Sequence, residues 1–572
     1  MTGAKQRQSL LYFPMLLFSN LDSHLLNPAR DPLVFDATLG AHGTYTTEHF
    51  VLRLSPRTHE LVDALTRGQT EGYDIGELFQ AYSTYLHETV HWWQHMGSTA
   101  GLILSLAYPA QIYGSMEFLQ TFARGAGGVK PIKAWAHKAM VDGKTHSDPV
   151  LAAANVAVNN ALDISFYKQL ACSPKAVLAL ERTPYFESVG HSYLKTYGET
   201  VHAITGSCDL TEGQFPDPGL WDPQFLELQL RRCEGFYHSS RPPYAEVGIQ
   251  EIFEGQARFC QIQFLASSGG PELLQTYRDQ GYFTPVYVNA FELFLRLTGI
   301  EWPERHDSPV VGLFLLVCDL AINPTRGFPL DIESFEDFIC DVDPGARFTR
   351  LCLAAAESPE LAQAVQTFSA LEYEQVAARL TDRCGYDDPR TGLDAVIRLL
   401  GDKGPVDALM EEHRTFAYAS VNVPVRVMVS HYIAFCRDKR RRPEFFCWPG
   451  IWMAGNNFTP EAGSLFISHL SLFQDRDDTE QIFPRAVRGR SPENINKLVN
   501  TFFGGMLVFD LALQWVLEPG PFRYDFKWLT GHSENAGLIA IAKRQFEHFY
   551  GLDPDTCIPI ASPDTPGAQG PS

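Results

Sequence analysis

The stretch His87-Glu-Thr-Val-His91 constrains this chain more than any other, because it has the pattern H-E-x-x-H. On an α-helix, residues four apart lie on one face about 6 Å apart along the axis, so both imidazoles can bind one metal ion. Glu88 then lies beside the metal, where a carboxylate can accept a proton from metal-bound water. Apolar residues at helical spacing between Leu78 and Met96 predict the helix. The alternative is a chance match, in which both histidines are hydrogen-bonded inside an ordinary core helix.

A second predicted helix, within residues 244–267, offers the best place for a third ligand. Catalytic zinc usually has three protein ligands and leaves the fourth position to water. In this segment the apolar residues cluster on one side of the helix, and small residues would let another helix approach closely. The polar side carries Glu251, Glu254, Arg258 and Gln261.

A helical H-E-x-x-H followed by a downstream Glu in an E-G-x-A setting resembles the gluzincin group of zinc metallopeptidases. The resemblance implies that His87 and His91 bind Zn²⁺ and that Glu88 is the general base. It implies Glu254, of Glu254-Gly-Gln-Ala257, as the third ligand, with Glu251 in reserve one helical turn earlier. It further implies a peptide or protein substrate and a zincin-like core with a small N-terminal sheet, whose edge could bind an extended peptide.

The chain departs from this family in two ways. His91 and Glu254 are 163 positions apart (254 − 91), which is longer than the spacing in compact members. Many members also carry Asp four residues after the ligand Glu, where this chain has Arg258. Glu254 could therefore form an i,i+4 ion pair with Arg258 instead of binding metal. The longer metzincin pattern is not indicated, because it needs Gly and His where this chain has Gln94 and Gly97.

Two other classes of function remain open. The tetrapeptide Glu88-Thr-Val-His91 recurs as Glu199-Thr-Val-His202. Two E-x-x-H pairs with two further Glu residues, here Glu117 and Glu254, build di-iron or di-manganese oxidoreductase sites in ferritin-like bundles. That arrangement would leave His87 without a role. The third class is a catalytically inactive protein that keeps a zincin-like scaffold for binding.

A peptidase also needs a donor that stabilises the tetrahedral oxyanion, commonly Tyr, His or Arg in this family. The sequence does not choose between several candidates. They are Tyr282, Tyr287, His413, His431 and Tyr432.

The expected fold class is mainly α (α+β). A β-hairpin is predicted over residues 33–54, followed by a helix over 57–67 and by Asp74 as N-cap of the motif helix. Later segments show helical periodicity up to about residue 549. The predicted regions are 1–130 (sheet and H-E-x-x-H helix), 131–330 (helices with the third ligand), 331–552 (C-terminal helices) and 553–572 (a disordered tail).

Composition narrows the partners and the compartment. The 572 residues carry a formal net charge of −21, which disfavours binding to nucleic acids or anionic membranes. Eleven cysteines without a C-x-x-C pair fit reduced thiols in the cytoplasm. No apolar run approaches the roughly 18 residues that a transmembrane helix needs, and the run at residues 10–18 lacks an A-x-A cleavage site. The oligomeric state stays open.

Overall fold

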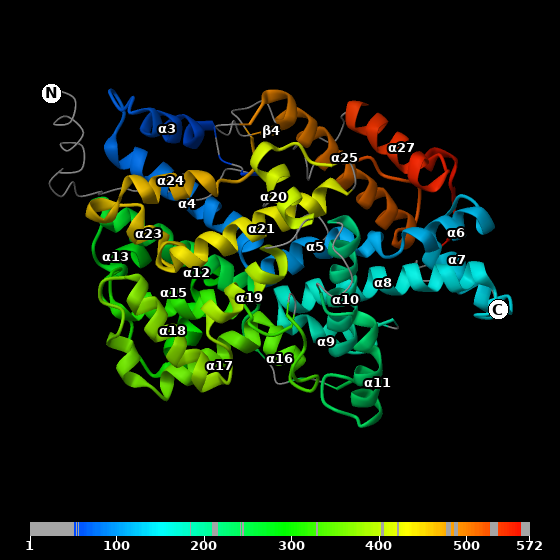
Figure 1. Ribbon diagram of the computed structural model, residues 1–572, viewed down its shortest axis with the longest axis horizontal. Coiled ribbons are helices and arrows are strands. Elements are labelled where there is room, and N and C mark those ends of the chain that lie inside the picture. The colour runs from blue at the N-terminus through cyan, green and yellow to red at the C-terminus, as the bar shows by residue number, and fades with distance from the viewer. Residues whose placement is uncertain are drawn as a thin grey trace.

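The computed structural model describes most of the chain after residue 50. The described residues are 51–52, 54, 56–183, 185–208, 215–240, 242, 245–327, 330–401, 405–419, 422–475, 482–484, 490–526 and 536–561. They are mainly helical, which confirms the predicted fold class at that level. Helices α12 (Ile249–Ser267), α15 (Pro309–Ile322), α17 (Pro344–Ala356) and α18 (Ala370–Cys384) gather on one side of the molecule (Figure 1). Helices α6 (Met116–Ala126), α7 (Ile132–Val141) and α27 (Ala536–Tyr550) lie at the other side, with α4 (Ile75–Gly97) and α5 (Thr99–Tyr113) running between the two groups.

Helix α4 (Ile75–Gly97) carries the H-E-x-x-H motif and begins as predicted. The carboxylate of Asp74 accepts a hydrogen bond from the backbone N–H of Glu77 and so caps the helix. Ser98 ends α4 and at the same time caps α5 (Thr99–Tyr113). Its hydroxyl donates to the Gln94 carbonyl at 2.6 Å and accepts from the N–H of Gly101 at 3.0 Å. One residue therefore fixes the corner between these two helices.

Other helices cover most of α4. It packs against α3 (Pro56–Arg67), α12 (Ile249–Ser267), α5 and α21 (Val423–Arg441). As a result 18 of its 23 residues are buried, including the side on which both motif histidines lie. The apolar side of α4 faces a core, and most of the opposite side is packed as well.

The remaining helices alternate with short connections. In the first half they are α6 (Met116–Ala126), α7 (Ile132–Val141), α8 (Pro149–Cys172), α9 (Val177–Leu180), α10 (Val189–Ser207), α11 (Asp222–Leu230), α13 (Leu274–Asp279), α14 (Pro285–Thr298) and α15 (Pro309–Ile322). In the second half they are α16 (Phe338–Val342), α17 (Pro344–Ala356), α18 (Ala370–Cys384), α19 (Pro389–Gly401), α20 (Pro405–Thr415), α22 (Pro443–Cys447), α23 (Pro449–Trp452), α24 (Pro460–Ser468), α25 (Pro492–Leu517) and α27 (Ala536–Tyr550).

A repeated sequence signal begins many of these helices. Proline occupies the first helical position directly after a capping Asp, Ser or Thr, where its fixed φ suits a helix and its missing N–H costs nothing. Helices α8, α15, α17, α24 and α25 all start in this way, and in each the capping side chain accepts a backbone N–H. The sequence therefore marks these boundaries locally.

Two small sheets join early and late parts of the chain. Strand β1 (Val51–Leu52) pairs in parallel with β3 (Phe473–Asp475), which pairs antiparallel with β4 (Ile482–Pro484). Strand β2 (Val129–Lys130) pairs in parallel with β5 (Ile558–Pro559). The predicted hairpin at 33–54 lies almost wholly outside the described residues. Residues 553–561, predicted as the start of a disordered tail, instead form a 3-10 turn and β5, while residues 562–572 lie outside the described part.

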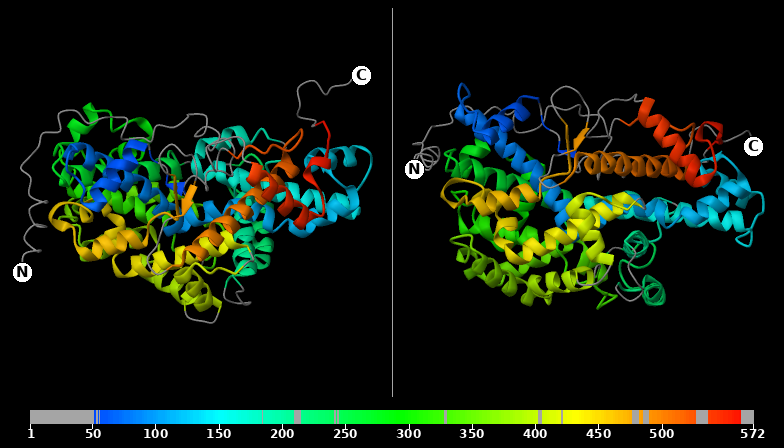
Figure 2. Two further views of the ribbon diagram at one scale, coloured as in Figure 1. Left: turned by 90° about the horizontal axis from the view of Figure 1, so that it is seen from above. Right: turned by 45° about the horizontal axis from the view of Figure 1, so that its top comes forward.

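The region 331–552 packs directly on the earlier regions. Helix α21 contacts α4, α5 and α10, and α25 contacts α5, α7 and α8 (Figure 2). The predicted domain boundaries therefore stay predictions, and extensive packing crosses them. All eleven cysteines are free thiols, as expected.

Helix α25 corrects one expectation from the sequence. Within the described part of the chain it is the one helix whose length and composition would allow it to cross a membrane. Its most apolar stretch is 61% buried, against α27, α21 and α5 among others.

Candidate metal centre

Helices α4 and α12 bring three potential metal ligands together. Nε2 of His87 and Nε2 of His91 lie 3.1 Å apart. Oε2 of Glu254 lies 3.5 Å from the former and 3.3 Å from the latter. Among the described residues this is the one group of three or more His, Cys, Asp or Glu ligand atoms close enough to hold one ion. The structure thus brings together the three residues that the sequence singled out.

The spacing of these atoms fits a zinc ion. In a tetrahedral site with bonds of about 2 Å, any two ligand atoms lie about 3.3 Å apart. The three observed separations, 3.1, 3.3 and 3.5 Å, bracket that value. Two imidazoles and one carboxylate also form a ligand set that leaves the fourth position of catalytic zinc open. The residues present therefore fit the ion that the motif implies.

Gln94 holds His91 in a fixed orientation. The Nδ1 atom of His91 lies 2.8 Å from Oε1 of Gln94. The amide nitrogen of Gln94 in turn donates to the carbonyl of Phe253 at 2.8 Å and to Oε1 of Gln256 at 2.9 Å. Gln94 therefore links the imidazole on α4 to α12 and directs the opposite ring nitrogen, Nε2, at the metal position.

The three side chains are electrostatically coupled. Burial lowers the pKa of His87 to about 3, which keeps this imidazole neutral and able to bind metal. Burial also opposes protonation of His91, but the charge of Glu254 outweighs it and raises the pKa to about 9. Burial of Glu254 is outweighed in the same way by His91, and its pKa falls well below the usual range. The positive charge that compensates Glu254 therefore lies on His91.

Glu88 and Tyr287 lie at the less buried side of the site. His87 and His91 are only 3% and 5% exposed, whereas Glu88 and Tyr287 are both partly exposed. The Tyr287 ring, on α14, lies edge-on to that of His87 with 5.9 Å between centroids. Burial raises the pKa of Tyr287 to about 12, so its phenol stays protonated and can donate a hydrogen bond. The negative charge of Glu88 acts on both His91 and Tyr287.

Gly255, directly after Glu254 on α12, faces α14. A Cβ atom at Gly255 would make ordinary van der Waals contacts, 3.6 Å from Cβ of Ala290 and 3.7 Å from the carbonyl oxygen of Tyr287. The E-G-Q-A stretch therefore provides Glu254 for the site and, one residue later, a point where α12 packs on α14 next to Tyr287.

Arg258 does not pair with Glu254, contrary to the structural alternative considered for that glutamate. Its guanidinium carbon lies 3.8 Å from the centroid of the Tyr287 ring, and Nη1 donates to Gln261 at 2.6 Å. The sequence did not predict the contacts of Arg258 or of Gln94. Gln94 could have been identified, because it lies three residues after His91 and therefore on the same face of the helix.

Several other candidates lie elsewhere. Glu251 accepts the backbone N–H of Gly248 at 3.0 Å and caps α12. Tyr432 hydrogen-bonds to Thr99 at 2.7 Å, and the rings of His413 and His431 contact each other with 4.4 Å between centroids. Of the five candidate oxyanion donors, Tyr287 is the one whose ring contacts that of a candidate ligand among the described residues.

The tryptophans after the motif belong to the core. The indole of Trp93 donates to the carbonyl of His469 at 2.8 Å, and its ring packs among phenylalanines of α22 and α24. Trp92 is fully buried and its ring contacts that of His431.

The second E-x-x-H pair does not join this site in the described structure. Glu199 accepts a hydrogen bond from Asn160 on α8 at 3.3 Å and lies against Gly114 at the end of α5. His202 and Glu117 are exposed. Within the part of the chain that the structure describes, Glu117, Glu199 and His202 therefore do not group with His87, His91 and Glu254.

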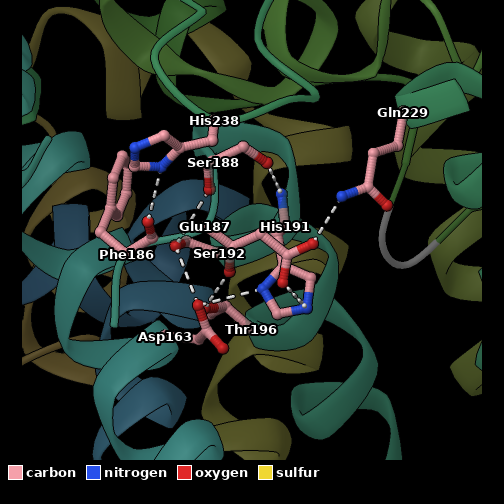
Figure 3. A network of polar contacts seen from close by, with 9 residues as sticks. All are labelled: Asp163, Phe186, Glu187, Ser188, His191, Ser192, Thr196, Gln229 and His238. Carbon is pink, nitrogen blue, oxygen red and sulfur yellow. Dashed lines mark hydrogen bonds and ion pairs between the residues drawn. The ribbon is translucent and has the colours of Figure 1, made fainter. Parts of the chain in front are cut away.

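A separate polar network occupies the start of α10. Nδ1 of His191 lies 3.1 Å from the buried Asp163 of α8, and Nε2 lies 3.6 Å from Glu187 (Figure 3). Ser192 also donates to Asp163, and Gln229 donates to Glu187. The network ties α10 to α8 and α11. Burial disfavours charge on His191, but Asp163 outweighs it and raises the pKa.

Comparison with known proteins adds no relative. No protein-family model, curated protein or solved structure matches this chain.

Proposed function

We propose that this protein is a zinc-dependent metallopeptidase. The observation that carries the proposal is the spacing of the His87, His91 and Glu254 ligand atoms, which matches the edges of a tetrahedral zinc site. His87 and His91 are four residues apart on one helix, and Glu88 lies between them in sequence. That order places a general base beside the metal.

Each residue has a distinct role in the proposed reaction. His87, His91 and Glu254 would hold zinc, which would supply Lewis acidity at the scissile carbonyl. The carboxylate of Glu88 would accept a proton from the attacking water and pass it to the leaving amine. Tyr287 donates a hydrogen bond to the oxyanion that develops on the substrate carbonyl. Gln94 keeps His91 oriented throughout.

The two alternative functions receive less support from the described residues. A di-iron or di-manganese oxidoreductase would need Glu199 and His202 near the first pair, and no such group is observed. An inactive zincin-like binding protein would not need the partly exposed carboxylate of Glu88 beside the ligands. The zincin-like core, the cytoplasmic location and the absence of nucleic-acid or membrane partners remain proposals.

Elemental analysis of purified protein tests the metal centre. We expect one zinc per chain in the wild type, in Glu88→Gln and in His202→Ala, and loss of zinc in His87→Ala. Two iron or manganese ions that disappear in His202→Ala would instead support the oxidoreductase. A single iron would also contradict the proposal, because two His and one carboxylate can hold Fe²⁺ in oxygenases.

Turnover is then tested on a peptide library with the zinc-loaded protein. We expect cleavage by the wild type and His202→Ala, and loss of at least about 100-fold in rate in Glu88→Gln, since general base catalysis contributes about 10²–10⁴-fold. Zinc without cleavage of any peptide in the wild type would support the binding protein.

A further inference from the structure

A buried positive charge that has no acidic partner among the described residues lies beside the candidate metal centre. Arg258 is 1% exposed. Its Nη1 donates to the neutral Gln261, and its Nε has no hydrogen-bond partner. None of the ion pairs formed by the described Asp and Glu residues includes Arg258. Buried arginines that have neither a carboxylate partner nor a hydrogen-bond acceptor for each N–H group are uncommon. The guanidinium of Arg258 is therefore suited to bind an anionic ligand.

The surrounding tyrosines compensate only part of this charge. The guanidinium carbon lies 3.8 Å from the Tyr287 ring centroid and 5.8 Å from that of Tyr282. Cation–π contacts of this kind offset less free energy than an unpaired ion loses when it moves from water to the protein interior. An anion that reached Arg258 would therefore gain a strong, charge-assisted interaction.

The nearest carboxylate on the same helix face is already engaged. Glu254, one turn before Arg258, points its Oε2 at the two imidazoles and not at the guanidinium. With a dication bound, the charges of Glu88, Glu254 and Arg258 leave the site with one excess positive charge. A substrate that carries one carboxylate would neutralise it.

Tyr287 places Arg258 within reach of the reacting bond. One face of its ring contacts the guanidinium, and the same ring contacts His87. An anion at Arg258 is thus separated from the metal ligands by little more than one aromatic side chain. The scissile bond and the anion must then belong to neighbouring parts of the same substrate.

We propose that Arg258 binds a carboxylate of the peptide substrate close to the scissile bond. The carboxylate can be the C-terminus of the peptide, which would make the protein a carboxypeptidase, or an acidic side chain. This inference rests on the proposed peptidase function, because it assigns the substrate class of that same site.

Binding to a protein that cannot turn over tests this inference apart from activity. The host is full-length, zinc-loaded Glu88→Gln, and the probes are acetyl-Ala-Ala-Phe-Ala as the free acid, its C-terminal amide, and the amide with Glu as the last residue. Calorimetry should show one carboxylate-bearing probe binding about 10- to 100-fold more tightly than the plain amide. The tighter probe identifies the source of the carboxylate.

The second variant is Arg258→Gln in the same host. We expect it to bind the preferred probe no better than the plain amide, with zinc content unchanged. Arg296→Gln is the matched control, because Arg296 is an exposed arginine on α14 that pairs with Glu246. It should keep the preference. A carboxylate preference that survives Arg258→Gln would overturn the inference, since the carboxylate would then bind zinc directly.

Two further outcomes stay informative. Equal binding of all three probes by the Glu88→Gln host overturns the inference even if Arg258→Gln fails to fold. Absence of zinc from the wild type, or absence of peptide cleavage, counts against the proposed function instead. In that case the probe comparison on the metal-free protein still tests Arg258, because the guanidinium belongs to the chain.

Discussion

At the scale of single residues, the candidate centre depends on Gln94 as well as on its three ligands. This amide accepts from His91 and donates to Phe253 and Gln256, so it joins both helices of the site. A histidine whose second nitrogen is held in this way binds metal in one tautomer and one orientation. The fixed ring is what makes the ligand spacing reproducible.

Replacing Gln94 with Ala should therefore weaken zinc binding without removing a ligand. Loss of a partner of this kind typically lowers metal affinity by about 10–100-fold. Competition with a chromophoric chelator measures the change. Gln275→Ala, at an exposed position on α13, is the control and should leave the affinity as in the wild type. Equal zinc affinity in Gln94→Ala would show that His91 needs no such support.

His191, in the polar network at the start of α10, should make the stability of the protein depend on pH. The pKa of His191 is raised because Asp163 outweighs burial, with Glu187 adding to the effect and Lys195 opposing it. Because the pKa of His191 is higher in the folded protein than in the unfolded chain, its charge stabilises the fold. This stabilisation is complete at a pH below the pKa in the unfolded chain, about 6.5, and it is lost as the pH rises through the pKa in the folded protein.

We therefore expect His191→Gln to be less stable than the wild type at pH 5.5, by on the order of 1 kcal/mol. The difference in unfolding free energy should shrink as pH rises above about 6.5. Chemical denaturation at a series of pH values measures it. A difference that is constant or grows with pH would mean that the charge of His191 contributes nothing.

Sequence reasoning located His87, His91 and Glu254 because the spacing of a metal motif is local within each helix. It could not decide whether Glu254 faces the histidines or Arg258, since an i,i+4 pair and an inward ligand are both compatible with one helix face. That choice depends on how α12 is rotated against α4. Only the three-dimensional packing fixes that rotation.

At the scale of elements, the corner between α4 and α5 has no space for a side chain at Gly101. A Cβ there would lie 2.0 Å from the carbonyl oxygen of Gln94, a backbone atom that cannot move without shifting the last turn of α4. The same carbonyl accepts the Ser98 hydroxyl. The close contact is therefore part of how the motif helix ends.

Gly101→Ala should destabilise the protein by about 1–3 kcal/mol, the usual range for overpacking, although alanine favours helices. Gly504→Ala is the matched control, because a Cβ in α25 would meet nothing closer than 3.8 Å. Its stability should be unchanged or slightly higher. Urea denaturation compares the two. A neutral Gly101→Ala would show that the corner relaxes freely.

Helix starts were largely predictable, and the environment of α4 was not. Proline after a capping residue marks a boundary within a few residues of sequence. Periodicity identifies an apolar side, but it cannot show that polar residues on the other side are also covered. Here the side chain of Gln94 hydrogen-bonds to Gln256, and that of Gln261 hydrogen-bonds to Arg258. Because their polar groups have partners, these three glutamines can be buried. Polar satisfaction of this kind is a property of pairs of helices.

At the scale of the whole molecule, the site depends on chain that lies far beyond its ligands. Phe445 and Phe446 of α22 and Phe466 of α24 surround Trp93, and α21 covers α4. All three ligands nevertheless lie before residue 330. The candidate ligands thus lie in the predicted regions 1–130 and 131–330, whereas α21, α22 and α24, which pack around the motif helix, lie in the region 331–552.

A fragment that ends at residue 330 should therefore fail to form the site. It keeps His87, His91 and Glu254 but exposes the apolar surface that α21, α22 and α24 cover in the full chain. We expect no cooperative thermal unfolding and no stoichiometric zinc, measured by calorimetry and elemental analysis. A fragment that melts cooperatively and holds one zinc would establish 1–330 as an independent unit.

The hydrogen bond from Trp93 to the carbonyl of His469 spans 376 positions of sequence. The ribosome synthesises α4 long before α24. The motif helix therefore lacks the covering contacts of α24 during most of the synthesis of the chain. Its histidines and tryptophans are then available to chaperones and to any metal in the surroundings. We therefore expect the zinc of the proposed site to be selected after translation, when the last helices close over the first.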